Sequence, residues 1–437
     1  MKRAVVLSGG GSRGGYEVGV WRALREMGLD FQIVTGTSVG SLNGLMMVQG
    51  DYEKAVEMWK ALTPEQVMNL TLPETARKAE GLFEFLRQSV FRGGADVSPL
   101  ANTLERVIDY DRFYASPVDF GLVTVAYPSF RPLVLKKEEI PREKLKDYLM
   151  ASAACFPAFQ PHVIDEKQYV DGGFFDNVPI NLAIEMGAEE IIAVELQDIN
   201  LVRPVRNKGI KIIRIGRKKR STLGPLLVFN PSQTMKNMNW GYQDCMKAFG
   251  RLEGDIYSFS KGFLKGECKR LKREYARLFH SCVKSYSYSF DHVAAMAHLK
   301  RALGGYLSRE GVPSLERALL RSAECAAGIL GLDDTAVYTS CRFHSAIREK
   351  LKTADSLPPG VREVILDGGL SPKEKLDRLG RLSGPDLLHF ACQRLRQLDE
   401  GTFPARKMNH ISAVFPQFVL GAVYCEALRR TSKKMDG

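Results

Sequence analysis

The first fifty residues contain one pattern twice: a short apolar run, a turn, and then apolar positions at helical spacing. Residues 3–8 are rich in valine and predict a strand, which is followed by a glycine-rich turn at 9–15 and a helix. Residues 31–35 predict a second strand, which leads through a turn around Ser38 into a second helix. Two strand-turn-helix units in succession favour an α/β domain with a mostly parallel sheet.

Strands and helices continue to alternate as far as about residue 260. Apolar runs predict further strands at residues 121–127, 131–136, 191–196 and 210–215. Helical spacing predicts helices within residues 52–109 and at 142–154, 181–186 and 232–250. A short run at 169–170 leads into Asp171-Gly172-Gly173, and a proline-containing loop is expected at 156–161.

The pattern changes after about residue 261, where helical spacing dominates and strand-like runs become few. Helices are predicted at residues 266–285, 292–308, 315–330, 336–351, 372–382, 386–398 and 414–430. We therefore expect an α/β domain at residues 1–260 and an all-helical C-terminal region at residues 261–437. The apolar stretch at 411–428 contains Pro416 and Glu426, which favours a packed or interfacial helix over a membrane span.

Composition places the chain among ordinary globular proteins, with 45% hydrophobic and 26% charged residues over 437 positions. The eight cysteines are scattered without a C-x-x-C pair, which argues against a zinc site and against a disulfide framework. The apolar run near the N-terminus is too short for a signal peptide or a membrane span, so we expect a cytoplasmic protein.

The net charge of +12 is unevenly distributed. Residues 1–260 hold 32 basic and 31 acidic residues, whereas residues 261–437 hold 30 and 19. A basic field of this kind favours polyanions, meaning anionic lipid surfaces or nucleic acid. Nucleic acid is disfavoured because no basic motif interleaved with aromatic residues and no recognised module is present.

Residues 203–220 add nine Lys and Arg without an acid. A solvated loop is the favoured reading, because half of the stretch is a predicted core strand. The alternative hypothesis is that residues 217–220, together with the basic C-terminal region, make peripheral contact with an anionic membrane. The oligomeric state is left open by the sequence.

Ser38 lies in the sequence Gly36-Thr-Ser-Val-Gly40, which matches the pattern G-x-S-x-G. Such a pattern sets a serine on a sharp turn between a strand and a helix, with its hydroxyl clear of the backbone. Five residues match by chance often, so the surrounding sequence must decide whether Ser38 is a nucleophile.

The glycine turn at residues 9–14 also reads G-x-G-x-x-G, the fingerprint of dinucleotide-binding proteins. Asp30 would be the ribose ligand in such a protein, but it precedes the second predicted strand instead of ending it. A P-loop is excluded because no Lys-Ser or Lys-Thr follows the glycines. A glycine turn at a helix N-terminus does supply backbone N–H groups that can stabilise an oxyanion.

A serine nucleophile needs a base, and histidine is the usual one. Of the seven histidines only His162 lies within residues 1–260, on a predicted loop with nothing beside it that suggests a triad. A partly desolvated carboxylate can also take the proton. Asp171 is the best placed, because a strand delivers it and two glycines follow it; its alternative reading is an Asx-turn residue.

Taken together, the motifs resemble those of the patatin-like phospholipase (patatin-like acylhydrolase) family. The resemblance rests on the glycine turn, the G-x-S-x-G motif, Asp-Gly-Gly at 171–173 and an alanine-rich block with prolines at 151–161. It spans roughly residues 3–260, in the order and spacing of the family. It says nothing of residues 261–437.

The resemblance implies a three-layer α/β/α fold and a Ser-Asp dyad that works without a metal or cofactor. Ser38 would be the nucleophile and Asp171 the base, and the oxyanion turn would be formed by Gly10, Gly11, Ser12 and Arg13. For the Arg13 side chain we favour a structural role in the turn over contact with a substrate phosphate. Asn43 and Asn177, beside the two motifs, are expected to stabilise turns.

The expected activity is hydrolysis of acyl esters of phospholipids or related lipids through an acyl-enzyme. One alternative is a thioesterase or small-ester esterase that uses the same dyad. The other is a catalytically idle lipid-binding effector module, which is disfavoured because both dyad positions are occupied.

Overall fold

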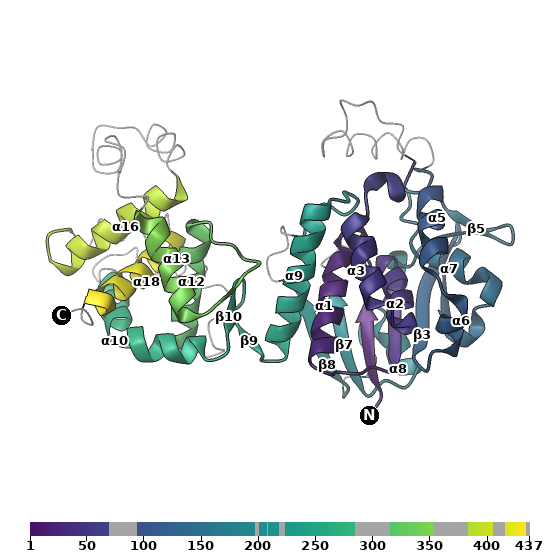
Figure 1. The fold of residues 1–437 in the computed structure, drawn as a ribbon, viewed down its shortest axis with the longest axis horizontal. Coiled ribbons are helices and arrows are strands. Elements are labelled where there is room, and N and C mark those ends of the chain that lie inside the picture. The colour runs from purple at the N-terminus through teal and green to yellow at the C-terminus, as the bar shows by residue number, and fades with distance from the viewer. Residues whose placement is uncertain are drawn as a thin grey trace. The chain divides into compact units, whose positions relative to one another are not determined.

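The structure is a computed structural model, and it describes residues 1–69, 94–196, 201–207, 209–217, 223–284, 315–352, 383–404 and 416–433. The chain divides into two compact units, Met1–Arg251 and Leu252–Gly437 (Figure 1). The division falls nine residues before position 260, where the change in sequence pattern placed it.

The first unit is built on an eight-stranded mixed sheet in the order β5-β6-β3-β2-β1-β7-β8, with β4 paired to β3. The strands β3, β2, β1, β7 and β8 are parallel, whereas β4, β5 and β6 are antiparallel to their neighbours, so the expected mostly parallel sheet is confirmed. The strands are β1 Arg3–Leu7, β2 Ile33–Thr37, β3 Asp119–Tyr127, β4 Arg131–Lys136, β5 His162–Ile164, β6 Lys167–Asp171, β7 Glu190–Glu195 and β8 Lys211–Gly216.

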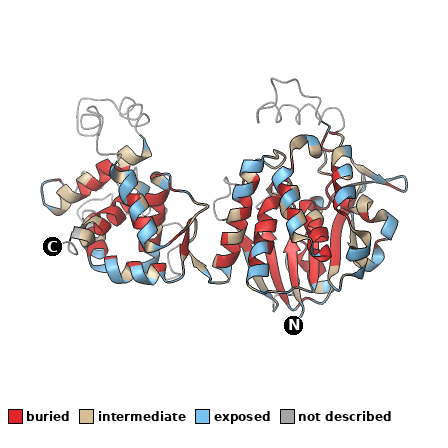
Figure 2. Ribbon diagram, viewed as in Figure 1, coloured by how far each residue is buried: buried red, intermediate tan, exposed pale blue. Residues whose placement is uncertain are grey.

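Helices cover both faces of this sheet. Ala4 and Val6 pack with Ile180 and Ala183 of α8 on one face, and Val5 and its neighbours point to the other because side chains alternate along a strand. Figure 2 shows the strands as the buried centre of the unit. The helices of this unit are α1 Gly15–Glu26, α2 Val39–Gln49, α3 Tyr52–Ala61, α5 Ser98–Val107, α6 Tyr110–Ala115, α7 Leu145–Ser152, α8 Ile180–Glu185 and α9 Pro231–Ala248.

Burial on both faces explains why the central strands read as continuous apolar runs without alternation. The short edge strand β5 has no such run, and the sequence predicted a loop at its first residue, His162. The structure corrects this, since β5 pairs with β6 through three residues. Much of the predicted helical stretch at 52–109 lies outside the described residues.

The second unit is mainly helical, which confirms the expected helical C-terminal region, but it is not all-helical. Strand β11 interrupts the predicted helix at 336–351 and belongs to a small sheet in the order β11-β10-β9. Its helices are α10 Phe263–Lys284, α12 Leu315–Ile329, α13 Ser340–Lys352, α16 Gly384–Asp399 and α18 Pro416–Lys433. Its strands are β9 Leu252–Glu253, β10 Ser258–Ser260 and β11 Val337–Tyr338. The predicted helices at 292–308 and 372–382 lie outside the described residues.

The helices of the second unit share one apolar core. Val419, Val423 and Tyr424 of α18 are buried in it with Leu319 of α12 and Leu271 of α10. The C-terminal apolar stretch was predicted to be a packed or interfacial helix, and its described part is a helix packed in this core. None of the helices in the described part of the chain has the length and apolar character that crossing a bilayer requires.

Candidate active site

Ser38 stands between the end of β2 and the start of α2 with backbone angles φ 55° and ψ −129°. A positive φ is uncommon for a residue with a side chain and costs free energy, so surrounding contacts must hold it. The residue is flanked by Gly36 and Gly40, as the G-x-S-x-G pattern predicts. The turn has the strained strand-to-helix form of a nucleophile elbow.

Hydrogen bonds to two other serines, Ser152 and Ser41, hold this turn in place. The backbone N–H of Ser38 donates to Oγ of Ser152 over 3.0 Å, and Ser152 Oγ donates to the carbonyl of Val123 over 2.8 Å. The hydroxyl of Ser41 donates to the carbonyl of Ser38 over 2.6 Å. Ser152 is the last residue of α7, in the alanine-rich block, so that block anchors the turn that carries Ser38. Sequence reasoning identified the block but not this role of Ser152.

Asp171 reaches the same place through the pairing of β3. Strand β2 pairs with the first half of β3, and its last residue, Thr37, lies opposite Val123. Strand β6 pairs with the second half of β3, and its last residue, Asp171, lies opposite Thr124, the residue after Val123. Strand β4 pairs with β3 along both halves, so it takes up one edge of β3. Strands β2 and β6 must therefore both lie on the other edge. The two strands therefore meet end to end, which sets Asp171 beside the turn that carries Ser38.

Gly172 allows this meeting. A Cβ atom at Gly172 would lie 2.2 Å from the carbonyl oxygen of Val123 and 3.0 Å from Cγ2 of Thr37. No real Cβ approaches backbone so closely, so a side chain at this position would push the end of β6 away from β3. The Asp-Gly-Gly motif thus requires glycine for close approach.

Asp171 is 5% exposed, and its carboxylate is held by its own turn. Its Oδ1 accepts a 2.7 Å hydrogen bond from the backbone N–H of Gly173, and the Asp171 N–H donates to the carbonyl of Ala154. The Asx-turn alternative is therefore realised. It does not compete with a catalytic role, because Asp171 and Ser38 line the same pocket.

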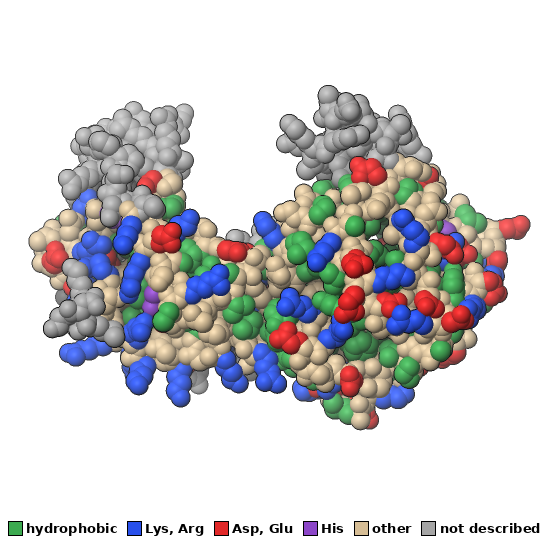
Figure 3. Space-filling model, in the orientation of Figure 1, with side chains coloured by type: hydrophobic (Ala, Val, Ile, Leu, Met, Phe, Trp, Pro, Cys, Tyr) green, Lys and Arg blue, Asp and Glu red, His purple; other side chains and the backbone are tan. Residues whose placement is uncertain are grey.

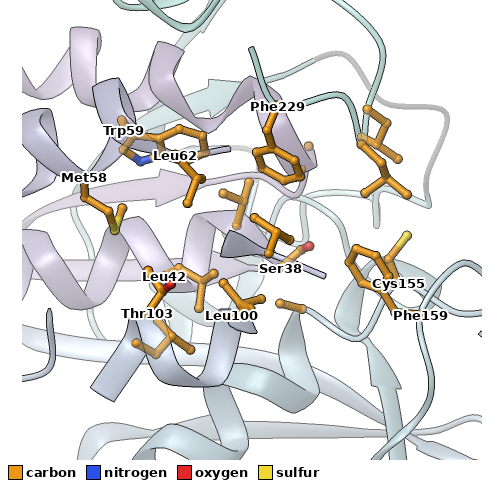
Figure 4. Close-up of a pocket in the computed structure, with 18 of the residues that line it drawn as sticks. Ser38, Leu42, Met58, Trp59, Leu62, Leu100, Thr103, Cys155, Phe159 and Phe229 are labelled. Carbon is orange, nitrogen blue, oxygen red and sulfur yellow. The ribbon is translucent and has the colours of Figure 1, made fainter. Parts of the chain in front are cut away.

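The pocket that Ser38 and Asp171 share is mainly apolar. Figure 4 shows Ser38 among side chains from α2, α3 and α5 and from the loops around Cys155 and Phe229. Its apolar lining includes Leu42, Met46, Met58, Trp59, Leu62, Leu100, Leu104, Phe159, Leu226, Leu227 and Phe229. A pocket of this kind favours a hydrocarbon group bound next to the serine hydroxyl.

Of the four residues of the predicted oxyanion turn, Gly10 and Gly11 line this pocket. Gly11 has φ 52°, and a Cβ there would lie 2.2 Å from the carbonyl oxygen of Leu226. The backbone N–H of Ser12 donates to that same carbonyl over 2.7 Å, and the N–H of Arg13 donates to the carbonyl of Gly10 over 3.1 Å. The amides of Ser12 and Arg13 are thus engaged within the fold.

The side chains of Ser12 and Arg13 tie the turn to residues 224–226. The Ser12 hydroxyl donates to the carbonyl of Pro225 over 2.8 Å, and Arg13 Nε donates to the carbonyl of Gly224 over 2.9 Å. Arg13 also donates to the carbonyl of Leu196. These contacts agree with the structural role favoured for Arg13.

The two asparagines beside the motifs also bond to turn backbone. Asn177 Nδ2 donates to the carbonyl of Gly9, and Asn43 Nδ2 donates to the carbonyl of Gly14 over 3.0 Å. Asn43 Nδ2 also donates to Oε2 of Glu17 over 2.7 Å, and its Oδ1 accepts from Nε1 of Trp59, which lines the pocket. A buried polar network therefore joins the glycine turn to the pocket wall.

Glu17, which the sequence did not single out, is 1% exposed within this network. Burial removes its charged form from water and raises the pKa of its carboxyl to about 8, against the lowering effect of the bond from Asn43. Asp176, after the Asp-Gly-Gly motif, also has its pKa raised, to about 6, by burial. Glu17 can be protonated at neutral pH while bonded to the turn.

Two residues for which the sequence suggested a role, His162 and Arg217, do not line this pocket. His162 Nε2 pairs with Asp147 at 3.1 Å on strand β5 and is not among the residues that line the pocket. Arg217 was part of the hypothetical membrane contact, but it is 2% exposed, pairs with Asp244 and stacks over Trp240. For Arg217 that hypothesis was wrong, and residues 218–220 lie outside the described residues.

The first unit is thus an α/β domain with a serine elbow and a buried carboxylate at one apolar pocket. Comparison with known proteins places it more closely: residues 5–184 match the family model of patatin-like phospholipases, so the resemblance drawn from the motifs is confirmed. No group of His, Cys, Asp and Glu within the described ranges could hold a metal ion.

Similar proteins cover this part of the chain. The mouse patatin-like phospholipase domain-containing protein 6 is 29% identical over 203 residues, which are 44% of this chain and 13% of that protein. An uncharacterized NTE family protein of Mycobacterium bovis is 26% identical over 195 residues, 44% of this chain and 48% of that protein. The matched part of the chain therefore spans about an eighth of the mouse relative and half of the bacterial one.

Two solved structures align with nearly the whole chain at low similarity. VipD from Legionella pneumophila has a TM-score of 0.34 and 13% identity, covering 98% of this chain and 91% of that one. The type III effector protein ExoU has a TM-score of 0.31 and 15% identity, covering 98% and 92%.

Proposed function

We propose that this protein is a serine acyl hydrolase that cleaves acyl esters of phospholipids or related lipids. The observation that carries the proposal is that Ser38 and Asp171 line one apolar pocket, delivered by two strands that meet end to end on β3. The family match over residues 5–184 supports the same class of reaction.

In the proposed mechanism Asp171 takes the proton of the Ser38 hydroxyl as the oxygen attacks the acyl carbonyl carbon. The backbone N–H groups of Gly10 and Gly11 would stabilise the oxyanion that forms, an interaction worth about 3–4 kcal/mol in the transition state. The alcohol leaves with the proton, and an acyl-serine remains. Water, deprotonated by Asp171, then attacks the acyl-serine and releases the fatty acid.

In the proposed dyad Asp171 acts without a histidine because both partners are held in fixed orientations. The hydrogen bond from Gly173 fixes the Oδ1 oxygen of Asp171 and so limits how the carboxylate can turn. The elbow conformation of Ser38, held by Ser152, fixes the other partner.

Lipid esters are favoured over small esters because most of the residues that line the pocket are apolar. Each methylene removed from water contributes about 0.8 kcal/mol, so a long acyl chain would bind far more tightly than an acetyl group. A thioesterase with the same dyad is the second candidate, since an acyl thioester presents the same chain to the same pocket. An idle lipid-binding module would share the pocket but not react.

The test is release of fatty acid from phosphatidylcholine vesicles, compared with hydrolysis of an acyl thioester of equal chain length. Ser38→Ala and Asp171→Asn should each abolish release, and Ser38→Ala should also abolish labelling by a fluorophosphonate. Asp147→Asn, which removes the negative charge beside His162 outside the pocket, is the matched control and should keep activity. Full activity in Ser38→Ala would refute the proposal, and wild type without activity or labelling would favour the idle module.

As a partner of the second unit we propose an anionic membrane surface, contacted through α10. Lys265, Lys269, Lys272 and Arg273 recur on the exposed side of this helix, while its two acids, Glu267 and Glu274, are buried. Figure 3 shows Lys and Arg side chains along the edge of the unit that α10 occupies. Each such residue near an anionic surface contributes about 1 kcal/mol.

The membrane proposal predicts salt-dependent binding to phosphatidylserine vesicles. Reversing Lys265, Lys269 and Lys272 to Glu should weaken this binding at least tenfold, whereas Lys54→Glu in the first unit should leave it within twofold. Binding that did not depend on salt or on the anionic lipid content would refute it.

A further inference from the structure

A second cavity, of about 440 Å³, lies between helices α13, α16 and α18 of the second unit. Four cationic side chains from the three helices line it: Arg348 and Lys352 from α13, Arg396 from α16 and Arg429 from α18. Its remaining wall includes Leu351, Cys392, Cys425 and Leu428. Nothing in the proposed acyl hydrolysis uses this cavity.

Two of the four cations are positioned by one buried carboxylate. Glu426 is 1% exposed; its Oε1 accepts a 2.7 Å hydrogen bond from Nε of Arg396, and its Oε2 accepts a 2.9 Å bond from Nε of Arg429. Each guanidinium is thus held through Nε, the nitrogen nearest its own chain. Both arginines remain about one third exposed, at 35% and 34%, so the pair is fixed in orientation but reachable from solvent.

The charges around the cavity do not balance. Among the described residues that line it, Glu426 is the only acid, and it faces four Lys and Arg. The other polar residues of the lining do not offset this positive charge, because histidine carries no negative charge and Ser432, to which Arg348 bonds, is neutral. A network that served only to hold the helices together would gain from matched acids, because like charges in a partly enclosed space repel one another.

We propose that this cavity binds a phosphate-bearing anion, either a phosphorylated lipid headgroup or a soluble phosphorylated compound. A phosphate monoester carries close to two negative charges and several acceptor oxygens, which match guanidinium groups held in a fixed orientation. The volume is larger than a bare ion needs and lies in the range of small-molecule sites. The shared recognition chemistry is the phosphate.

The first arm of the test measures binding of inorganic pyrophosphate to the full chain by titration calorimetry. Lys352→Glu and Arg348→Gln should each weaken binding at least tenfold, since both side chains line the cavity but neither bonds to Glu426. Lys350→Glu is the matched control: it makes the same charge change two residues away on α13, outside the lining, and should keep the affinity within about twofold. Equal losses in Lys350→Glu and Lys352→Glu would overturn the proposal, and so would no binding to any probe.

The second arm separates the two sources of phosphate. Vesicles of phosphatidylcholine with one fifth phosphatidic acid are compared with pure phosphatidylcholine, with and without competing pyrophosphate. Retention that requires phosphatidic acid and Lys352 supports a headgroup, whereas pyrophosphate binding without retention supports a soluble ligand. Both readouts are independent of Ser38, so Ser38→Ala should behave as wild type, and the site stands or fails separately from the proposed hydrolase activity.

Discussion

The hydroxyl of Ser152 accepts a hydrogen bond of 3.0 Å from the backbone N–H of Ser38. The two residues are 114 positions apart in the chain, and the same hydroxyl donates to the carbonyl of Val123 on β3. This contact joins α7, the central sheet and the strained elbow. Because a positive φ at Ser38 is unfavourable by itself, a bond to its own N–H is where the fold offsets that cost.

Replacing Ser152 by alanine should therefore affect both stability and activity. The buried N–H of Ser38 and the carbonyl of Val123 would each lose a partner, which costs about 1–3 kcal/mol per unsatisfied group. We expect Ser152→Ala to lower the urea midpoint of the first unit and to lower kcat for ester hydrolysis more than it raises KM. Ser129→Ala, at an exposed turn, is the control; a Ser152→Ala protein as active as wild type would contradict this role.

The raised pKa of Glu17 predicts that the free energy of unfolding depends on pH. Its pKa is about 8 in the folded protein and 4.5 in the unfolded chain, so between these values the folded state holds a proton that the unfolded state releases. The free energy of unfolding must then fall as pH rises from about 4.5 to 8. Stability from this residue is fully present below pH 4.5 and is lost above pH 8.

The variant Glu17→Gln should remove this dependence. Glutamine keeps an oxygen that can accept the bond from Asn43 but cannot ionise. Between pH 6.5 and 8 the wild type should lose about 2 kcal/mol of unfolding free energy from this group, and the variant should lose almost none of it. Urea unfolding in this window avoids the titration of Asp176, whose pKa is about 6. Parallel curves for the two proteins would show that Glu17 does not titrate there.

The parts of the site that could be predicted from sequence are those set by local chemistry. The turn around Ser38 follows from glycines two positions away on either side, and the strands that lead to Ser38 and Asp171 follow from their apolar residues. Glycine after Asp171 signalled a close approach, and the structure supplies the neighbour, Val123, on another strand.

Residues whose role depends on distant partners were not predictable. Ser152 looks like any small residue in an alanine-rich helix until the helix end is placed beside β3. Arg217 stands in a run of cations and was expected at the surface, but Asp244 and Trp240 of α9 pair with it and stack on it within the fold. When a buried charged residue is paired with residues of a distant helix, the sequence around it does not reveal the burial.

The close approach at Gly172 gives a third prediction. Alanine at this position would set its Cβ against the carbonyl of Val123, which belongs to the central strand and cannot move aside. Gly172→Ala should destabilise the first unit by about 1–3 kcal/mol and sharply reduce ester hydrolysis, because the strand that delivers Asp171 must shift. Gly266→Ala is the control: nothing lies within 4 Å of its Cβ and alanine favours the helix α10, so stability should hold or rise. Equal thermal midpoints for the two variants would contradict the crowding.

The apolar pocket gives the fourth prediction, which concerns chain length. Leu100 lines the pocket from α5 and is 8% exposed, so Leu100→Trp would fill space that an acyl chain is proposed to occupy. Because Leu100 bonds to neither Ser38 nor Asp171, the proposed dyad should stay intact and short esters should still react. We expect kcat/KM for a long-chain ester to fall about tenfold or more relative to that for a butyrate ester. Val163→Trp, at an exposed position of β5, should leave the ratio unchanged. If Leu100→Trp lowered both activities equally, the added ring would be disturbing the dyad and this pocket would not be where chain length is measured.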